Sequence, residues 1–535
     1  CGDCSVYSNC VSVQPLETEF GRKRQIDQSS CNKDFSCAKG FCPSFVSVLG
    51  GKLRKIQPKD SADEAFDRLP QPQVASSTSP YGIVIAGVGG SGIITVGALL
   101  GMAAHLENKG VTVLDMTGVA QKGGAVTTYV RIADRPDMLN TVRIAAGAAN
   151  AVIGCDMLVT AENSILTRMQ RGVTRAVVNT HRMATIGFIK NRDLQTPWEA
   201  MSEGLEAAIG PEAGRFIDAT QLATDLTGDA MATNILMLGA AFQLGMLPVS
   251  ESALLRAIEL NGASVQANKR AFLWGRMAVH DPEFVAQQVS AKGMAVGTDT
   301  VLAASSAERA ARRIGYLSEY QGASLAARYS KLVERVRQAE TRVLPSGDTR
   351  LSDAVALNYF KLLAIKDEYE VARLYTDGKF RRQLEETFEG DFKLRYHFAP
   401  PLLARPDPDL GVPRKRTYGA WMTPVLHILK RMKPLRGTML DPFGYTEERK
   451  LERALIRDYE STVNEILEKL TASNSDTAVS LASLPDMIRG YGHVKRKSID
   501  EAKARARVLK ARLGGEPEPH ETPPALRKVI RIQSA

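Results

Sequence analysis

Residues 81–93 read Tyr-Gly-Ile-Val-Ile-Ala-Gly-Val-Gly-Gly-Ser-Gly-Ile, a short apolar run that stops at a cluster of glycines. Such a run is typical of a buried parallel strand. The alanine- and leucine-rich residues that follow, Ile93 to Leu106, predict a buried helix. This strand–turn–helix unit predicts an α/β domain built on a parallel sheet.

The same alternation of strand and helix signals continues downstream. Apolar runs predict further strands at residues 111–114, 127–132, 157–159 and 176–179. Longer apolar stretches predict packed helices at residues 234–247, 250–260 and 265–277. We therefore predict a Rossmann-like domain over residues 81–285, with a parallel sheet covered by helices.

The glycine-rich turn is a candidate binding site for an anionic ligand. Gly87, Gly89 and Gly92 lie between a strand and a helix, as a dinucleotide-binding turn requires, and Gly90 lies beside them. Asp115, at the end of the next predicted strand, would fit the ribose of a dinucleotide. Three interpretations stay open: a dinucleotide site, a site for another phosphate-bearing ligand, and tight packing of the helix on the sheet.

A second glycine turn, Gln121-Lys-Gly-Gly124, separates two predicted strands. It would bring a lysine and free backbone N–H groups to the same crevice, which favours an anionic ligand. The candidate ligand-binding residues are Gly87, Gly89, Gly90, Gly92, Lys122, Gly123 and Gly124.

Six of the seven cysteines fall within the first 42 residues. Disulfides need an oxidising compartment, and we expect no export signal, so they are disfavoured. A structural zinc site usually shows two close pairs, and this segment has one. Iron–sulfur ligation is favoured because short gaps let thiolates converge, and Cys42-Pro43 matches the C-P ending of bacterial ferredoxin motifs. The candidate metal ligands are Cys1, Cys4, Cys10, Cys31, Cys37 and Cys42.

These six cysteines cannot complete two four-cysteine sites. Either one cluster leaves two spare thiols or further ligands precede Cys1, and we expect the second. The chain opens without methionine, inside a cysteine motif, so we expect an upstream part of the protein. Cys155 stands apart and is predicted to be a small buried hydrophobe.

The rest of the chain divides by composition. Residues 1–50 form the predicted ferredoxin-like iron–sulfur segment, and residues 51–80 a polar linker with a short helix at 61–69. Residues 286–535 predict a mostly α-helical domain, with an amphipathic helix after Thr446 as N-cap. The segment 514–522, rich in Pro and Glu, is predicted to be loose.

Bulk properties exclude several classes of function. The formal net charge is +10, but no nucleic-acid-reading motif accompanies the basic residues, so we expect solvated surface or a face for an acidic protein. No apolar stretch is long enough to span a membrane, and we expect no signal peptide. We expect a cytoplasmic protein that binds neither nucleic acid nor membrane.

Several motifs resemble the indolepyruvate ferredoxin oxidoreductases of the 2-oxoacid:ferredoxin oxidoreductase superfamily. Residues 1–45 resemble the iron–sulfur segment of the fused enzymes, and residues 81–285 resemble their gamma domain. In that gamma domain an Arg-Gly-Gly element stands where this chain has Lys122-Gly123-Gly124, a departure that keeps the positive charge. The terminal helical domain is similar at Lys366–Tyr375, Phe388–Arg395 and Leu440–Gly444.

The resemblance implies oxidative decarboxylation of an arylpyruvate to an acyl-CoA, with electrons passed through [4Fe–4S] clusters to ferredoxin. It implies thiamine diphosphate and Mg in the upstream part, CoA as a substrate, and a homo-oligomer. It assigns no catalytic residue to this chain. It also makes a structural or CoA-facing role for the glycine turn the better interpretation. Two alternatives stay open: an NAD(P)-dependent iron–sulfur oxidoreductase, and a zinc-stabilised interaction protein without redox function.

Overall fold

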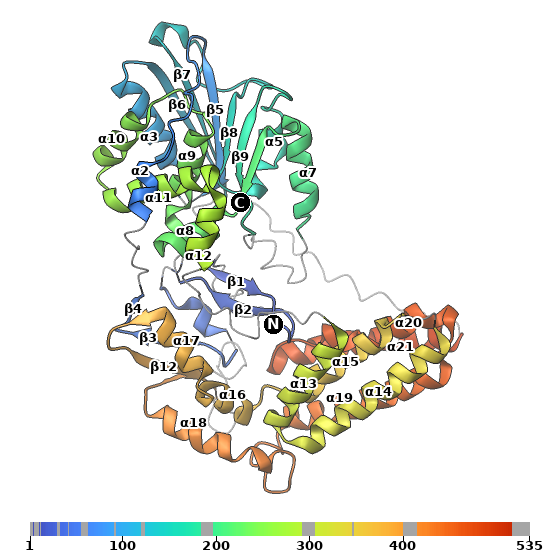
Figure 1. Ribbon diagram of the computed structural model, residues 1–535. Coiled ribbons are helices and arrows are strands. Elements are labelled where there is room, and N and C mark those ends of the chain that lie inside the picture. Colours follow the sequence, from blue (N-terminus) through green and yellow to red (C-terminus); the bar gives the residue numbers. More distant parts are fainter. Residues whose placement is uncertain are drawn as a thin grey trace, which may run out of the picture.

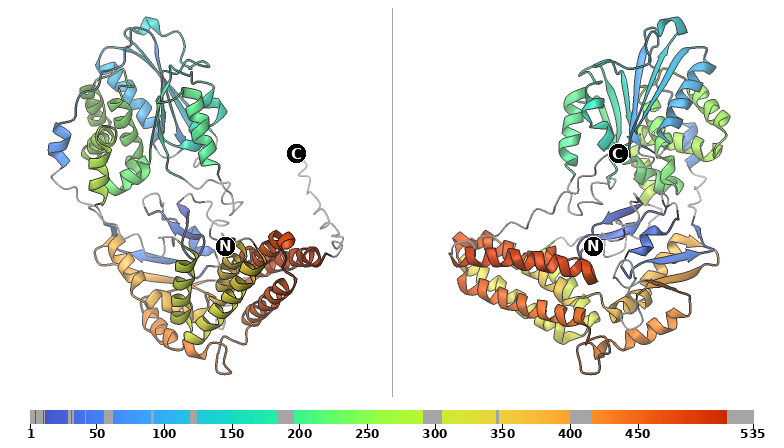
Figure 2. Two further views of the ribbon diagram at one scale, coloured as in Figure 1. Left: turned by 45° about the vertical axis from the view of Figure 1, so that its right-hand side comes forward. Right: turned by 180° about the vertical axis from the view of Figure 1, so that it is seen from behind.

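The chain is described by a computed structural model with two lobes (Figure 1). The α/β domain forms the upper lobe, and the C-terminal helices form the lower one. The two views of Figure 2 agree, and both place strands β1 (Val13–Leu16) and β2 (Lys23–Ile26) between the lobes. The structure describes residues 4, 10, 12–28, 31, 33–40, 42–54, 62–89, 92–118, 124–182, 196–290, 305–344, 347–399 and 415–515.

The upper lobe is built on a mixed sheet. Within the described residues this sheet has six strands in the order β10-β9-β8-β5-β7-β6. Four of them are parallel neighbours: β5 (Tyr81–Val88), β8 (Ala151–Gly154), β9 (Arg175–Asn179) and β10 (Gly214–Ile217). The predicted α/β fold class is confirmed.

Strand β7 departs from the parallel pattern that the sequence predicts. β7 (Ala125–Ala133) runs antiparallel to both β5 and β6 (Gly110–Thr117) and lies between them. Residues 118–124, which join β6 to β7, are fewer than the dozen or so that a parallel crossover needs. The short connection therefore forces an antiparallel neighbour into the sheet.

Residues 157–159 were expected to form a strand, and that prediction is wrong. They belong to α4 (Met157–Thr160), whose N-cap Asp156 accepts a hydrogen bond from the Val159 N–H at 3.0 Å. The buried strand here is β8, a few residues earlier. An apolar run this short has no period that distinguishes a strand from a helical turn.

Helices cover both faces of the sheet, as Figure 1 shows. Alternation along β5 points Ile83 and Ile85 to one face and Val84 and Ala86 to the other, and each pair enters a separate core. The first face carries α3 (Ile93–Leu106), α8 (Ala219–Thr227), α9 (Thr233–Gln243), α10 (Glu251–Asn261), α11 (Val265–His280) and α12 (Pro282–Ser290). The second carries α4, α5 (Asn163–Leu166) and α7 (Trp198–Ile209).

Helices α9 and α11 approach one another through glycine. A Cβ on Gly239 would lie 2.0 Å from the Phe272 carbonyl oxygen, and one on Gly275 would lie 1.9 Å from the Leu236 carbonyl oxygen. No side chain larger than hydrogen fits at either position. This contact presses α11 onto α9, which itself packs on β8 and β9.

The lower lobe is mostly helical, as expected. Thr446 caps the long helix α19 by accepting a hydrogen bond from the Arg449 N–H. The apolar face of α19 packs into a core that it shares with the surrounding helices. The helices of this lobe are α13 (Ser306–Tyr320), α14 (Ala323–Val343), α15 (Arg350–Leu363), α16 (Glu368–Thr376), α17 (Lys379–Thr387), α18 (Met422–Arg431), α19 (Glu447–Lys469), α20 (Ser475–Ala482) and α21 (Gly492–Gly514). The predicted loose segment 514–522 lies almost wholly outside the described residues.

The lower lobe also contains strands that join the two ends of the chain. β3 (Val46–Leu49) pairs antiparallel with β12 (Lys393–Phe398), which also pairs with β13 (Arg416–Tyr418). β4 (Lys52–Leu53) pairs with β11 (Phe388–Glu389). The N-terminal segment is thus built into the C-terminal lobe.

The segment after β4 contains the short helix that the sequence predicts, α2 (Asp63–Asp67). Phe66 meets Trp274 of α11 edge to face, with ring centroids 4.9 Å apart. The buried Arg276 guanidinium donates to the Pro70 carbonyl oxygen at 3.0 Å. These contacts hold residues 62–70 against the α/β domain. Among the residues described, no helix has the length and apolar character to cross a membrane.

Candidate functional site

The glycine turn lies at the carboxyl end of β5, where parallel α/β sheets usually bind ligands. Gly87, Gly89 and Gly92 are described, and the Gly89 N–H donates to the Gly124 carbonyl oxygen at 2.8 Å. The two predicted glycine turns are therefore adjacent. Gly90, Lys122 and Gly123 lie outside the described residues.

Packing and backbone geometry explain the glycines that are described. A Cβ on Gly87 would lie 2.5 Å from Ile93 Cδ1 and 3.2 Å from Cys155 Cβ, so glycine lets α3 start tight against the sheet. Gly92, the N-cap of α3, has a φ of +94°, which L side chains rarely adopt. These requirements hold with or without a ligand and favour the structural interpretation of the turn.

Asp115 is not placed as a ribose-binding residue would be. β7 separates its strand from β5, and its carboxylate accepts a hydrogen bond from Thr128 Oγ1 at 2.5 Å. In a dinucleotide-binding fold the acidic residue ends the strand next to the glycine turn. The geometry therefore gives the dinucleotide interpretation no support.

A polar cluster that sequence reasoning missed surrounds the same sheet edge. Asn179, buried at the end of β9, donates to the Cys155 carbonyl oxygen at 3.0 Å and to Thr220 Oγ1 at 2.9 Å. His181 Nδ1 lies 3.0 Å from Asp218 Oδ1. The signal for Asn179 was a polar residue that ends a buried apolar strand, whereas β10, which precedes Asp218, is only partly buried.

Local interactions shift the pKa values of two carboxyl groups near this sheet edge, Asp156 and Asp218. Burial raises the pKa of Asp156, although backbone N–H groups of α4 oppose the shift. Burial also acts to raise the pKa of Asp218, but hydrogen bonds from His181 and Gln221 outweigh it and lower that pKa. The carboxyl edge of the sheet thus presents an anionic Asp218 paired with the His181 imidazole, at the end of β10, with β9 and β8 between it and the strand that carries the glycine turn.

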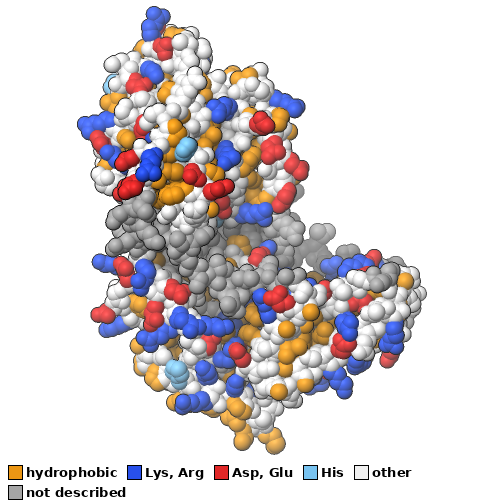
Figure 3. Space-filling view, in the orientation of Figure 1, with side chains coloured by type: hydrophobic (Ala, Val, Ile, Leu, Met, Phe, Trp, Pro, Cys, Tyr) orange, Lys and Arg blue, Asp and Glu red, His pale blue; other side chains and the backbone are white. Residues whose placement is uncertain are grey.

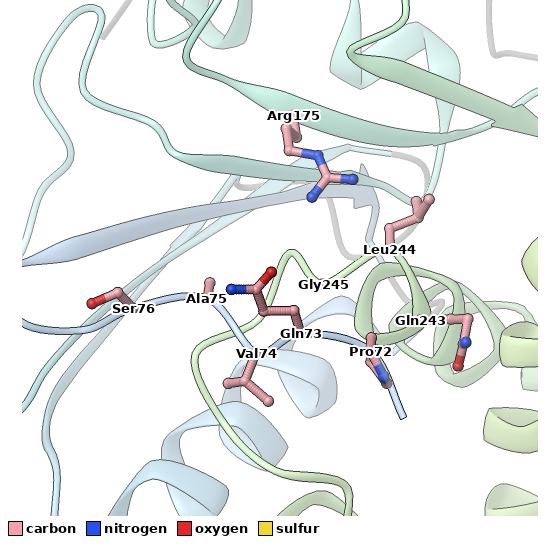
Figure 4. Close-up of a pocket in the computed structure, with 9 residues that line it drawn as sticks. All are labelled: Pro72, Gln73, Val74, Ala75, Ser76, Arg175, Gln243, Leu244 and Gly245. Carbon is pink, nitrogen blue, oxygen red and sulfur yellow. The ribbon is translucent and has the colours of Figure 1, made fainter. Parts of the chain in front are cut away.

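A surface pocket of the α/β domain lies at the opposite edge of the sheet. It has a volume of about 450 Å³ and is lined by residues 72–76, Arg175 and residues 243–245. Figure 4 shows Arg175 reaching from its strand toward the segment that carries Gln73. Arg175 starts β9, level with Ala151 at the start of β8, so this pocket is remote from the glycine turn.

The cysteine segment brings several thiols together. Cys4 is buried, and Cys10, Cys31 and Cys37 are half-buried. Burial raises the pKa of Cys37 to about 11, and the neighbouring thiols of Cys31, Cys4 and Cys10 add to the shift. The Lys33 N–H donates to the Cys31 sulfur at 3.4 Å, on a loop where Lys33 and Phe35 have positive φ.

Cys42, another candidate metal ligand, lies next to the lower lobe. Burial raises the pKa of the Tyr375 and Tyr491 hydroxyls, and the nearby Cys42 thiol adds to that shift. Cys1 lies outside the described residues. In the described part of the chain, no three His, Cys, Asp or Glu side chains form a group that could hold a metal ion. A four-iron cluster is larger than an ion and needs thiolates spaced further apart, so three thiols near Cys37, with the Lys33 N–H aimed at the Cys31 sulfur, fit that group.

Cys155 is buried, as predicted. It lies in the apolar core beneath the glycine turn, and burial raises the pKa of its thiol well above the ordinary value. A thiol that stays protonated is a poor nucleophile or metal ligand. Cys155 therefore acts as a packing residue.

Two family matches cover different parts of the chain. Residues 82–278 match the family described as pyruvate ferredoxin/flavodoxin oxidoreductase, which is the α/β domain. Residues 306–508 match a family of unknown function, and these residues make up most of the lower lobe.

Curated relatives resemble the α/β domain. The "indolepyruvate oxidoreductase subunit IorB" of Methanothermobacter thermautotrophicus is 27% identical over 194 residues, which are 36% of this chain and 94% of that protein. A protein of the same name from Thermococcus kodakarensis is 28% identical over 205 residues, 38% of this chain and 96% of its own length. The expected resemblance to indolepyruvate oxidoreductases is confirmed.

A solved structure was also matched. The gamma subunit of a keto/oxoacid ferredoxin oxidoreductase from Geobacter sulfurreducens is 21% identical, with a TM-score of 0.27, and the match covers 37% of this chain and 98% of that one. Residues 82–278 of this chain are thus similar to the pyruvate ferredoxin/flavodoxin oxidoreductase family.

Proposed function

We propose that this chain is the electron-transfer and gamma-like part of an indolepyruvate ferredoxin oxidoreductase. The complete enzyme would decarboxylate an arylpyruvate oxidatively, form the acyl-CoA, and pass electrons through [4Fe–4S] clusters to ferredoxin. The names of the curated relatives support the substrate class. No residue described in this chain is assigned to the decarboxylation step.

The observation that carries the proposal is that Cys4, Cys10 and Cys31 all lie near Cys37, in a chain that also holds a domain similar to the pyruvate ferredoxin/flavodoxin oxidoreductases. Their thiolates would hold the cluster, and Cys1 and Cys42 are candidates for further ligation. When bound, a [4Fe–4S] cluster supplies one-electron transfer. The Lys33 N–H, which already points at the Cys31 sulfur, would stabilise negative charge on that sulfur.

Ferredoxin is the proposed electron acceptor, and charge supports that choice. The chain carries a net charge of +10, and Figure 3 shows Lys and Arg side chains distributed over both lobes. Lys33 and Lys39 lie within the cysteine segment itself. An acidic electron-transfer protein would be drawn to such a surface, and its encounter rate would fall as salt rises.

The first test is the metal content of the chain purified without oxygen. We expect iron and acid-labile sulfide in equal amounts, about four of each per cluster, and an EPR signal after dithionite reduction. Replacing Cys4 or Cys31 with serine should remove most of that iron, because each supplies a thiolate to the group. Cys155→Ala is the matched control and should leave the iron unchanged.

Two outcomes would contradict the proposal. One is zinc without sulfide in the unaltered chain, which would support the zinc-stabilised alternative. The other is an iron content that Cys155→Ala lowers as much as Cys31→Ser does.

A further inference from the structure

We propose that the C-terminal lobe, whose family has no known function, holds the cysteine segment in place, and that Lys415 is a positioning residue for the loop from Cys37 to Cys42. The holding role stands on contacts in the protein alone. The effect on a cluster rests on the proposed function.

Lys415 closes the loop that carries the last two cysteines. Its ammonium donates to the Ala38 carbonyl oxygen at 3.1 Å and to the Cys42 carbonyl oxygen. It also lies 5.6 Å from the centre of the Phe45 ring. One cation thus joins the beginning and the end of a five-residue loop, in charge-assisted hydrogen bonds stronger than those of a neutral donor.

Helix α16 holds the next two residues of the segment. At its end, the Tyr375 hydroxyl donates to the Pro43 carbonyl oxygen at 3.0 Å. Just before its start, the Lys366 ammonium donates to Ser44 Oγ. Both residues belong to the motif Lys366–Tyr375, and its two ends therefore contact consecutive residues that follow Cys42.

Buried ion pairs make α16 a rigid support. Asp367 caps the helix and pairs with Arg436, with Nη2 and Oδ1 2.9 Å apart. One turn later, Glu370 pairs with Arg373 at 2.7 Å, and both side chains are less than a tenth exposed. A paired, buried network of this kind fixes the position of the side chains that form it.

A second pair of contacts holds the middle of the cysteine segment. Arg313 of α13 forms an ion pair with Glu19 at 3.7 Å, and both side chains are nearly inaccessible to solvent, at 5% and 3%. Phe20 packs its ring 4.9 Å from Tyr316 and 5.4 Å from Phe360, measured between centroids. The segment between the two groups of cysteines is therefore anchored in the lower lobe.

Strand pairing completes the attachment. β3 follows Pro43 by two residues and pairs with β12 over four residues. His397 of β12 bridges β3 and β13, with Nε2 2.8 Å from Ser47 Oγ and Nδ1 3.3 Å from Thr417 Oγ1. Side chains and backbone of the lower lobe thus contact the cysteine segment in four places: through Lys415, through α16, at Glu19 and Phe20, and along β3.

Hydrogen exchange and redox titration of the full chain test this inference. In the chain stripped of metal, Lys415→Met should speed amide exchange in residues 37–45 by about tenfold, because two charge-assisted hydrogen bonds are lost. In the metal-loaded chain, an EPR-monitored titration should show a lower midpoint potential, because a nearby cation is removed. Lys415→Arg should restore the potential, since it keeps the charge.

Two further variants keep the test decisive. Tyr375→Phe removes one donor without removing packing, and it should speed exchange only around residues 43–45. Lys469→Met, which removes an exposed cation from α19, is the matched control and should change neither measurement. Exchange in residues 37–45 that is the same for Lys415→Met and Lys469→Met would overturn the holding role. A chain that binds no iron would refute the proposed function, while the exchange experiment would still decide this inference.

Discussion

Gly275→Ala is expected to unfold the α/β domain or to lower its free energy of unfolding by about 3 kcal/mol or more. The new Cβ would lie 1.9 Å from the Leu236 carbonyl oxygen and 3.0 Å from the Ala240 nitrogen. Both are backbone atoms inside α9, so the clash cannot be relieved by rotating a side chain. Gly239→Ala should behave similarly, because its Cβ would meet the Phe272 carbonyl oxygen at 2.0 Å.

Denaturant unfolding followed by hydrogen exchange in α9 and α11 would measure this loss. Gly204→Ala is the control, because Gly204 lies within α7 and a Cβ there meets no atom within 4 Å. That variant should gain up to about 1 kcal/mol, since alanine favours the helix over glycine. Equal effects of the Gly204 and Gly275 variants would contradict the close approach of α9 and α11.

Arg373→Ala is expected to cost about 3–5 kcal/mol in the lower lobe. Its guanidinium pairs with Glu370, whose side chain is 2% exposed, and stacks 5.0 Å from the Tyr316 ring centre. Removing the arginine leaves a buried carboxylate without its cation, and such a charge is far costlier than a lost surface pair. Thermal unfolding of the lobe would give the size of the effect.

A double variant separates the unpaired charge from lost packing. Arg373→Met with Glu370→Leu should recover much of the stability, because a buried ion pair can often be replaced by apolar side chains at little cost. Arg381→Ala breaks an exposed pair with Glu385 and should change stability by less than about 1 kcal/mol. An Arg373 variant as stable as the Arg381 variant would show that the buried network contributes little.

Local signals made part of this fold predictable from sequence. The strand at Ile83, the glycine turn and helix Ile93–Leu106 are consecutive, so their pattern is complete within one short window. The long helix after Thr446 was predicted for the same reason, since its apolar stripe repeats over 23 residues. The length of such a segment and the period of its apolar residues are enough to predict a helix or a strand without knowledge of tertiary contacts.

Non-local contacts explain what the sequence did not predict. β3 finds its partner in β12, hundreds of residues away, and neither strand is long enough to give a clear alternation. Residues 157–159 are apolar enough for a strand, but the Asp156 cap turns them into a helix. The residues at the sheet edge, Asn179, His181 and Asp218, come together only when the parallel strands align.

The sequence indicated which residue types belong to the candidate site, but not which residues pack against them. Spacing alone indicated that the cysteines act together, yet it gave no sign that Cys42 stands against Tyr375. Among the predicted glycines, Gly92 has a positive φ, and Gly87 lies where a side chain would clash. The packing of Gly87 against Ile93 and Cys155 depends on where α3 lies, and no sequence pattern specifies that distance.

The pairing of β3 with β12 sets an order of events during synthesis. Ser47 and His397 are separated by 350 residues, and a ribosome adding about 5–20 residues per second needs roughly 20–70 s to cover that distance. Throughout this interval the nascent thiols are already outside the ribosome while their support does not yet exist. If the cysteines hold the proposed cluster, its assembly should follow completion of the lower lobe, and cells that translate slowly or lack oxygen protection should yield more chains with oxidised cysteines.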